Sequence, residues 1–444
     1  MIIYITNEIS VRELPGYLLF ATVAAAEKKQ VFILSSTDTY LYSRLSVLKP
    51  GALLVKNLNI PTTSAQMYQQ YIDQSLHIYC QEQEPPIIFS SIDKYTYTMQ
   101  ITVDQILPFK AVFCFGDRDT TYYKELFSNR GKIFHNTGSP RVNIWTDKFT
   151  SLYLSNNTPQ SNRGYILVVS NFGSFMGRNH MTEMLVTSQS LELLNTLDLE
   201  EEQIQFYEED VIIGLRTILA LKHLAHTYPH IRILVRPHPV DNVKYWLNIF
   251  GKLQPNVEVI SNQDDITPWI AGAVCIIQNG CTSALEAVVQ KIPVISYGPD
   301  RIHGGNSIPN QMGIRCRTFD ELKSAVNRII KTDDYTTYQE QSETLLKPIL
   351  NYNCNAAAEM LKIMAHESQL LTGYRLTGVD VLKLRAIRQS KSVIDSLRKL
   401  NVERESYTLN AQYIRGKIAV IARILKLPVP RIHMIGDSGV LIEN

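Results

Sequence analysis

The chain has 444 residues, of which 45% are hydrophobic and 19% are charged, an ordinary balance for a folded protein. This length suits two lobes and an appendage better than one hydrophobic core. The formal net charge of only +2 argues against a protein devoted to nucleic acid, which would carry a concentrated basic face. Nucleic acid is therefore not expected among its partners.

The start of the chain and its cysteines indicate a cytoplasmic protein. MIIYITNEISVREL has no basic start followed by a long apolar stretch, so it is not expected to be a signal peptide. No segment approaches about eighteen uninterrupted apolar residues, so no bilayer-spanning helix is expected. The six cysteines lack CxxC spacing, which favours reduced, mostly buried thiols over a zinc site or disulfides.

Short apolar runs alternate with helical patterns over residues 1–155. Strands are predicted in IIYIT, VFILSS, PIIFSS, AVFCFG and KIFHNTGSP, and a helix in LLFATVAAAEKK. Continuous apolar strands separated by helices are typical of βαβ units with a parallel sheet. We therefore expect a Rossmann-like lobe here, followed by a polar linker at 155–164.

A second alternation over residues 164–365 predicts another lobe of the same kind. Strands are expected in YILVVSN, IRILVRPHP, VEVIS, AVCIIQNG and PVISYGP, and helices in DVIIGLRTILALKHLAHTY and TSALEAVVQ. The predicted fold class is thus α/β, with two Rossmann-like lobes. Residues 366–444 remain as a basic helical extension.

That extension contains two amphipathic basic segments, LKLRAIRQSKSVIDSLRKL and YIRGKIAVIARILKL. Three interpretations stay open: helices packed on the lobes, a surface held peripherally against the inner membrane, or an oligomer contact. Anionic head groups attract such segments by roughly 1 kcal/mol per basic residue.

The strongest local signal is VRPHP, in which Arg236 and His238 follow a strand. Ligands of open α/β sheets bind beyond the carboxyl ends of the strands. A guanidinium and an imidazole in that position can both donate to phosphate or carboxylate oxygens. A structural turn, with His238 capping backbone carbonyls, is the alternative.

A second strand end, IIQNGCTSALEAV, predicts a phosphate-binding turn. Asn279 and Gly280 are expected to form the turn, and Thr282 or Ser283 the N-cap of the next helix, where a hydroxyl and free amides favour an anion. Glu286 lies one turn further on the same face, where its carboxylate can accept hydrogen bonds from ribose hydroxyls. Ordinary capping, with Glu286 solvated, is the alternative.

Two further loops of this lobe follow strands. In VVSNFGS, Asn171 and Gly173 suggest a close approach of the backbone to a ligand. The loop 298–310 is rich in Gly, Pro and polar residues. Three strand-end motifs suited to anions in one lobe together predict a nucleotide site.

RPHP, the pair Pro268–Trp269 and QNGCTSALEAVVQKIPVISYGP together resemble the bacterial surface carbohydrate biosynthesis family. That family is similar to the retaining β-Kdo glycosyltransferases and, more distantly, to capsule Kdo transferases and sialyltransferases with an HP motif. In the first lobe VRELPGYLLFATVAAAEKKQVFI, KPGALLVKNL and NTGSPRVNIW also look like the family's pattern. The resemblance covers roughly residues 8–320.

The resemblance implies a GT-B glycosyltransferase that transfers Kdo or a related ulosonic acid from a CMP-sugar to a glycan or lipid-linked glycan of lipopolysaccharide O-antigen or capsule. The donor would bind in the second lobe and the acceptor would enter from the first. Arg236 and His238 would contact phosphate or the sugar carboxylate, while Thr282, Ser283 and Glu286 would hold phosphate and ribose. No metal is expected, because protein dipoles and cations take the charge of the leaving phosphate.

Two departures from the family's pattern concern the first lobe. Family members often carry an acidic cluster where this chain has SSIDKYTY, which leaves Asp93 as the candidate acid/base. The phrase that resembles GNPRFD ends in Asn143 instead of Asp. Both changes point to altered acceptor chemistry.

A retaining double displacement would also need a carboxylate nucleophile. Glu208, Glu209 and Asp210, at the expected start of the helix before RPHP, and Asp117 after a strand are candidates. A solvated helix start and a simple turn are their alternatives. For the whole chain, the alternatives are a UDP- or CDP-donor transferase, a non-hydrolysing epimerase, and a catalytically silent scaffold of polysaccharide assembly.

Overall fold

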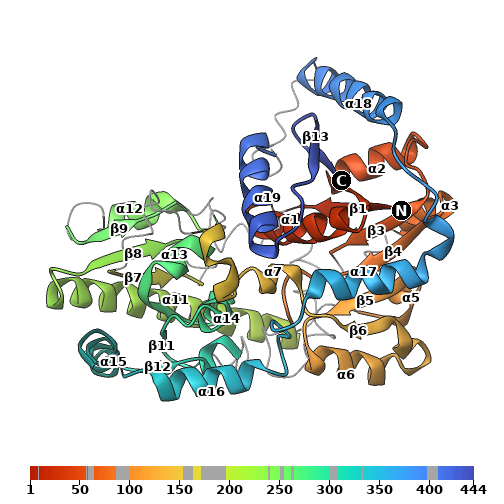
Figure 1. Ribbon diagram of the computed structural model, residues 1–444. Coiled ribbons are helices and arrows are strands. Elements are labelled where there is room, and N and C mark those ends of the chain that lie inside the picture. The colour runs from red at the N-terminus through yellow and green to blue at the C-terminus, as the bar shows by residue number, and fades with distance from the viewer. Residues whose placement is uncertain are drawn as a thin grey trace. The chain divides into compact units, whose positions relative to one another are not determined.

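The computed structural model describes residues 1–8, 10–56, 58, 65–86, 101–153, 164–171, 197–238, 241–250, 255–261, 265–300, 308–332, 334–397 and 409–444. The chain divides into two compact units (Figure 1). Unit 1 comprises residues 1–85, 96–152 and 347–444, and unit 2 comprises residues 86–95 and 153–346. The expected strand PIIFSS and the expected linker lie almost wholly outside the described residues.

Unit 1 is built on an eight-stranded sheet of order β13-β14-β2-β1-β3-β4-β5-β6. Six of these strands run parallel: β1 (Ile2–Asn7), β2 (Gln30–Ser35), β3 (Gly51–Val55), β4 (Leu76–Cys80), β5 (Phe109–Cys114) and β6 (Phe134–Asn136). Strands β1, β2 and β3 are buried along their whole length, which is why they read as continuous apolar runs. Sequence analysis did not predict β3 and β4.

The helices of unit 1 connect and cover these strands. They are α1 (Ser10–Ala26), α2 (Ser36–Arg44), α3 (Ala65–Asp73), α5 (Val103–Ile106), α6 (Asp117–Leu126), α7 (Pro140–Asn143), α17 (Ala356–Glu367), α18 (Gly378–Leu397) and α19 (Ala411–Leu425). Helix α1 begins at Ser10, earlier than the predicted start at Leu18, because Leu14 and Tyr17 also face the core.

The C-terminal extension is not only helical, contrary to the prediction. Strands β13 (Arg431–Ile435) and β14 (Gly439–Glu443) form an antiparallel hairpin, and β14 pairs antiparallel with β2. Helix α19 packs on α1, so the blue C-terminal elements in Figure 1 lie beside the red N-terminal ones. Residues from 347 onward belong to unit 1, whereas the predicted second lobe runs to 365, because α17 buries its apolar face on α1.

Unit 2 has a six-stranded parallel sheet of order β12-β11-β10-β7-β8-β9. Its strands are β7 (Tyr165–Val169), β8 (Arg232–Arg236), β9 (Val257–Val259), β10 (Ala273–Gln278), β11 (Val294–Tyr297) and β12 (Ile314–Cys316), of which only β12 was not predicted. The helices are α11 (Leu197–Thr227), α12 (Val243–Phe250), α13 (Thr267–Ala271), α14 (Ser283–Val289), α15 (Phe319–Thr332) and α16 (Thr336–Leu346).

The parallel part of each sheet has a topological switch point, where successive strands begin to be added on the opposite side. In unit 1 the chain runs from β1 to β2 on one side and then to β3 on the other. In unit 2 it runs from β7 to β8 and β9, and then returns to β10 on the other side of β7. The carboxyl ends of the two strands at a switch point form the crevice in which open α/β sheets bind ligands.

Two sequence expectations concern the chain as a whole. Within the described ranges, no helix combines the length and the apolar character needed to cross a bilayer. All six cysteines are free thiols, and Cys80, Cys114, Cys275 and Cys316 are buried, as predicted.

Candidate functional site

The loops after β7 and β10 meet at the switch point of unit 2. Asn171 follows β7, and its Nδ2 donates to the carbonyl oxygens of Gly280 at 2.9 Å and Asn279 at 3.4 Å. Gly280 has a φ of 72°, in the left-handed region that favours glycine, so the predicted Asn-Gly turn is confirmed. Two of the predicted motifs are therefore joined directly at the crevice.

The same turn is also fixed from the other side. The Nδ2 of Asn279 donates to the carbonyl oxygen of Tyr297 at 2.8 Å, which ties the turn to the end of β11. The amide of Gly280 donates to Oδ1 of Asn310 at 2.6 Å. Sequence analysis did not single out Asn310; its only signal was the polar composition of the loop 298–310. Three asparagines thus hold this turn rigidly.

The start of α14 differs from the predicted cap. Thr282 occupies the N-cap position with φ −58° and ψ −22°, and its side chain makes no capping hydrogen bond. This helical conformation prevents the hydroxyl from folding back onto the first-turn amides. The amides of Ala284 and Leu285 donate instead to the carbonyls of Cys281 and Thr282, both at 3.0 Å.

Hydrogen-bonding capacity is nevertheless left over at this position. The hydroxyl of Ser283 is buried, with the residue 5% exposed, and has no hydrogen-bond partner within the described part of the chain. The amides of Thr282 and Ser283 also donate to no group there. Buried polar groups are nearly always paired, and an exception needs an explanation. A bound oxyanion would supply the acceptor for all three groups.

Glu286 lies one turn into α14, as expected, but it is not solvated. The residue is buried, and its Oε1 accepts a hydrogen bond of 3.1 Å from Nε2 of Gln290. The alternative of a solvated Glu286 is therefore wrong. Its proposed contact with ribose stays a prediction.

The turn that carries His238 is held through the main chain. The backbone amide of His238 lies 2.8 Å from Oγ of Ser170 and 3.0 Å from Oδ2 of Asp241. Asp241 also accepts from Nε1 of Trp246 at 3.0 Å and from the Ser170 hydroxyl. Sequence analysis missed both Ser170 and Asp241. An aspartate between PHP and the next helix was the available signal, since such a residue commonly binds nearby amides.

Arg236 is the last residue of β8 and lies beside this turn, but its side chain is directed to the β9 side of the strand and not to the β7 side. The residue is buried, and its Nη1 donates to the carbonyl oxygen of Ser261, just beyond β9. Strand β9 is on the side of β8 away from the switch point. Arg236 therefore has at least one structural contact, and its contact with a donor stays a prediction.

The candidate carboxylates occupy different places. Helix α11 begins at Leu197, so Glu208, Glu209 and Asp210 lie inside it and not at its start as predicted, because the preceding Leu, Glu and Gln residues also favour helix. Asp210 is buried and Glu209 is half-buried. Gly298 directly follows β11, and a Cβ built on it would lie 3.7 Å from the side chain of Ile213 in α11. This stretch of α11 therefore borders the end of β11, and Asp210 lies one turn before Ile213 on the same face of the helix.

The remaining predicted residues are not brought to this crevice. Asp117 is the exposed first residue of α6 in unit 1, and its Oδ1 accepts from Nδ2 of Asn136 at 2.7 Å. Asp93 and Gly173 lie outside the described residues. Among the residues that the structure describes, no three His, Cys, Asp or Glu side chains form a metal-like cluster. Independence from metal stays a prediction.

Comparison with known proteins supports the fold and no family. No protein-family model and no curated protein sequence matches the chain. The wall teichoic acid polymerase TagF is 12% identical with a TM-score of 0.50, over 84% of this chain and 90% of its own. A UDP-N-acetylglucosamine 2-epimerase is 8% identical with a TM-score of 0.51, over 83% and 96%. A Listeria monocytogenes protein described as such an epimerase is 11% identical with a TM-score of 0.50, over 83% and 97%.

At these identities the similarity concerns the fold alone. It extends over more than four fifths of this chain and nine tenths or more of the other proteins. The chain therefore has the GT-B fold class with two Rossmann-like α/β lobes, as predicted.

Proposed function

We propose that this chain is a GT-B glycosyltransferase of surface carbohydrate biosynthesis, which binds the nucleotide of an activated sugar at the switch point of unit 2. The observation that carries this proposal is the buried Ser283 hydroxyl, without a partner in the described residues, beside two amides with none. Hydroxyl and amide donors in a crevice are the groups that hold a phosphate oxyanion.

We further propose a CMP-linked donor, Kdo or a related ulosonic acid. A CMP-sugar has a single phosphate, which matches one small set of donors made by Thr282 and Ser283. The resemblance of RPHP and QNGCTSALEAVV to the Kdo transferase-like family favours the same donor. In this proposal His238 donates to the leaving phosphate, with Ser170 and Asp241 as positioning residues of its turn. The acceptor is a glycan or lipid-linked glycan.

A second candidate is a transferase with a UDP- or CDP-linked donor, or an epimerase. It is favoured by the named activities of the structurally similar proteins, a wall teichoic acid polymerase and UDP-N-acetylglucosamine 2-epimerases. A diphosphate has two charged groups, so this candidate requires donors beyond Thr282 and Ser283. Preference for UDP or CDP over CMP would favour it.

Titration calorimetry with CMP, UDP and CDP tests both candidates. We expect CMP to bind most tightly and Ser283→Ala to lower its affinity by about tenfold to a hundredfold, the usual effect of losing a hydrogen bond to a charged group. The melting temperature should not fall, because this hydroxyl has no partner in the described residues.

Ser342→Ala is the matched control in the same unit. Ser342 is also buried, but its hydroxyl accepts from the amide of Gly313 at 2.9 Å and donates to Tyr338 at 2.7 Å. This variant should lose stability and keep its affinity for CMP. If Ser283→Ala binds CMP as tightly as the wild-type chain, the assigned site is wrong; if no nucleotide binds, the function is wrong.

A further inference from the structure

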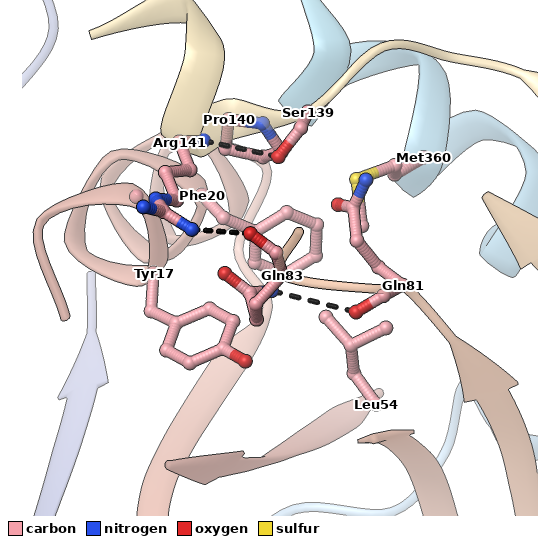
Figure 2. Close-up of a pocket in the computed structure, with 10 residues that line it drawn as sticks. Tyr17, Phe20, Leu54, Gln81, Gln83, Ser139, Pro140, Arg141 and Met360 are labelled. Carbon is pink, nitrogen blue, oxygen red and sulfur yellow. Dashed lines mark hydrogen bonds between the residues drawn. The ribbon is translucent and has the colours of Figure 1, made fainter. Parts of the chain in front are cut away.

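The two edges of the unit 1 sheet differ in what their side chains leave exposed. At the carboxyl edge polar groups are paired: the Nζ of Lys56 contacts Oε2 of Glu8 and lies 3.3 Å from Oε1 of Glu13. Figure 2 shows the pocket of this edge, where Nη1 of Arg141 donates to the carbonyl oxygen of Gln83. The pocket has a volume of about 10 Å³, room for about one water molecule. The described part of this edge is thus filled by its own side chains.

At the opposite, amino edge, residues 368–383 (the edge segment) cross the starts of the strands. Gln30, the first residue of β2, donates from Nε2 to the carbonyl oxygen of Leu376 at 3.0 Å and accepts the Leu376 amide at 2.7 Å. The Nζ of Lys49, shortly before β3, donates to the carbonyl oxygen of Arg375 at 3.1 Å. In Figure 1 the edge segment runs from the end of α17 into α18 and passes the N-terminus. These contacts hold the edge segment on unit 1.

Some apolar side chains of the edge segment anchor it, and others are exposed. Leu371, Leu376 and Val381 are buried. Four large side chains instead face solvent and form an apolar patch: Leu370 (90% exposed), Tyr374 (43%), Val379 (76%) and Leu382 (63%). Single exposed apolar residues are normal, but a group of large ones marks a contact surface. The apolar patch therefore indicates a contact with another molecule.

Basic side chains lie at the same edge. Two come from the edge segment and two from the turn before β2, and together they form a basic rim: Lys28, Lys29, Arg375 and Lys383. Burial first, and then the charges of Lys29 and Arg375, lowers the pKa of the Met1 amine, so these two side chains lie near the start of β1. Lys383 shares a face of α18 with Val379, four residues earlier. The basic rim and the apolar patch thus share one surface of unit 1.

The acidic residues of these stretches do not cancel this charge. Asp380 binds the Nζ of Lys49 at 2.6 Å, so a lysine outside the basic rim neutralises it. Glu27 is the other acidic residue, next to Lys28 in the sequence. No side chain of the basic rim forms an ion pair within the described residues. The surface therefore carries a net positive charge.

A bilayer with anionic head groups fits this surface better than a protein partner does. Lysine is depleted from protein–protein interfaces, whereas here lysines accompany the exposed apolar side chains. Large apolar side chains together with Lys and Arg are typical of surfaces that lie on a membrane, where the apolar groups enter the head-group layer. Leu370, at 90% exposed, can do so without rearrangement of unit 1.

We propose that the amino edge of unit 1 docks on a bilayer that contains anionic lipids, with the apolar patch among the head groups and the basic rim against the lipid phosphates. Of the two basic helices considered from the sequence, only the first turns of α18 belong to this surface, because α19 packs on α1. The switch point of unit 1 lies at the other ends of the strands, so docking does not cover it. The proposal goes beyond the proposed function and does not depend on the nucleotide site.

Co-sedimentation of the full chain with lipid vesicles tests this surface. We expect binding to vesicles of equal parts phosphatidylglycerol and phosphatidylcholine, and much weaker binding to pure phosphatidylcholine. Salt should weaken the binding, because the Debye length falls from about 10 Å at 0.1 M to about 3 Å at 1 M. Lys383→Glu changes two units of charge and should lower the partition coefficient about twentyfold, at about fivefold per unit. Leu370→Gln should lower it about tenfold, through the lost apolar burial.

Lys323→Glu in α15 and Leu219→Gln in α11 are the matched controls, because they change the same residue types at exposed positions of unit 2. Both should bind vesicles as the wild-type chain does. Circular dichroism verifies that each variant is folded. Lys383→Glu and Leu370→Gln should keep the wild-type affinity for CMP, so a failure of this surface can be distinguished from a failure of the nucleotide site.

Three results would overturn the proposal: no binding to the mixed vesicles, equal binding to both kinds of vesicle, or wild-type partition in both Lys383→Glu and Leu370→Gln. Sedimentation velocity without vesicles examines a further occupant. A dimer of the wild-type chain that Leu370→Gln abolishes would show that a second copy covers the apolar patch, and it would overturn the proposal as well.

Discussion

Single residues at the two switch points differ in how their polar groups are satisfied. In unit 2 the Ser283 hydroxyl has no partner within the described residues, whereas each of the asparagines around it makes a hydrogen bond to a backbone group. In unit 1 Lys56, Glu8 and Glu13 form a closed network, and Glu82 stands beside it with a raised pKa. In unit 2 the residues that hold the turn in shape are thus distinct from the hydroxyl that remains available to a ligand.

Glu82 should make stability depend on pH in a definite direction. Its folded pKa of about 7 lies above the ordinary value of 4.5, so the folded chain binds the proton more tightly than the unfolded chain. The resulting stabilisation is complete below pH 4.5 and is lost as the pH rises through about 7. At roughly 1.4 kcal/mol per pH unit, it amounts to about 3 kcal/mol.

Thermal melts at about pH 5 and about pH 8, on either side of that pKa, provide the measurement. Glu82→Gln stays neutral, so relative to the wild-type chain its melting temperature should be several degrees higher at the upper pH than at the lower. A difference between the two proteins that does not change with pH would mean that the carboxyl group titrates normally.

At the scale of elements, α7 is joined to a distant part of the chain by one side chain. The Nδ2 of Asn143 donates to the carbonyl oxygens of Tyr352 at 3.1 Å and Cys354 at 3.0 Å, and its Oδ1 accepts the amide of Ala356 at 3.0 Å. Only an amide can both donate and accept in this way. Asn143 stands where the resembling family has aspartate, and here it fixes the segment that leads into α17.

Asn143→Asp should therefore destabilise unit 1. A carboxylate would face two carbonyl oxygens that had lost their donor, in a buried position, at a cost of about 3 kcal/mol. Asn355→Asp is the matched control, because Asn355 caps α17 only as an acceptor, from Ala358 at 3.3 Å, and aspartate caps equally well. Urea unfolding of both variants tests this, and equal stabilities would contradict the role given to Asn143.

On the scale of the whole molecule, unit 1 is assembled from both ends of the chain. Strand β14 pairs with β2, and the side chains of Ile414, Ile418 and Ile421 in α19 are fully buried. In α18, Arg388 and Lys391 bind the buried carboxylate of Asp38. These two basic residues serve internal ion pairs, so the positive charge of the extension is not wholly available to a membrane.

Removal of residues 376–444 should consequently unfold unit 1. Each large apolar side chain in this segment contributes about 1.5–3 kcal/mol by burial, and several of them together approach the total stability of a typical domain. If each unit unfolds in its own thermal transition, circular dichroism melts of the truncated chain should lack the transition of unit 1. Lys383→Glu, at an exposed position of α18, should leave that transition unchanged and is the proper variant for liposome binding. A truncated chain with both transitions intact would contradict this assembly.

The amino-acid sequence by itself determined the local features. Strands β1, β2, β5, β7, β8, β10 and β11 are continuous apolar runs, and the Asn279–Gly280 turn needs a left-handed residue, so both follow from short-range preferences. Strands β12, β13 and β14 were missed, as were β3 and β4. Strands β12 and β13 are short edge strands, and β14 exists only through its pairing with β13 and with the distant β2, such as Ile442 with Val31.

Only the tertiary structure decided which polar residues meet. Ser170 and Asp241, or Glu8, Lys56 and Glu82, are far apart in the sequence, and each is unremarkable in its own segment. The order of the strands brings each set to one edge of its own sheet. Burial then determines that the Ser283 hydroxyl is left without a partner in the described residues and that the carboxyl group of Glu82 has a raised pKa. Strand order and burial depend on packing over the whole unit, and no local pattern encodes them.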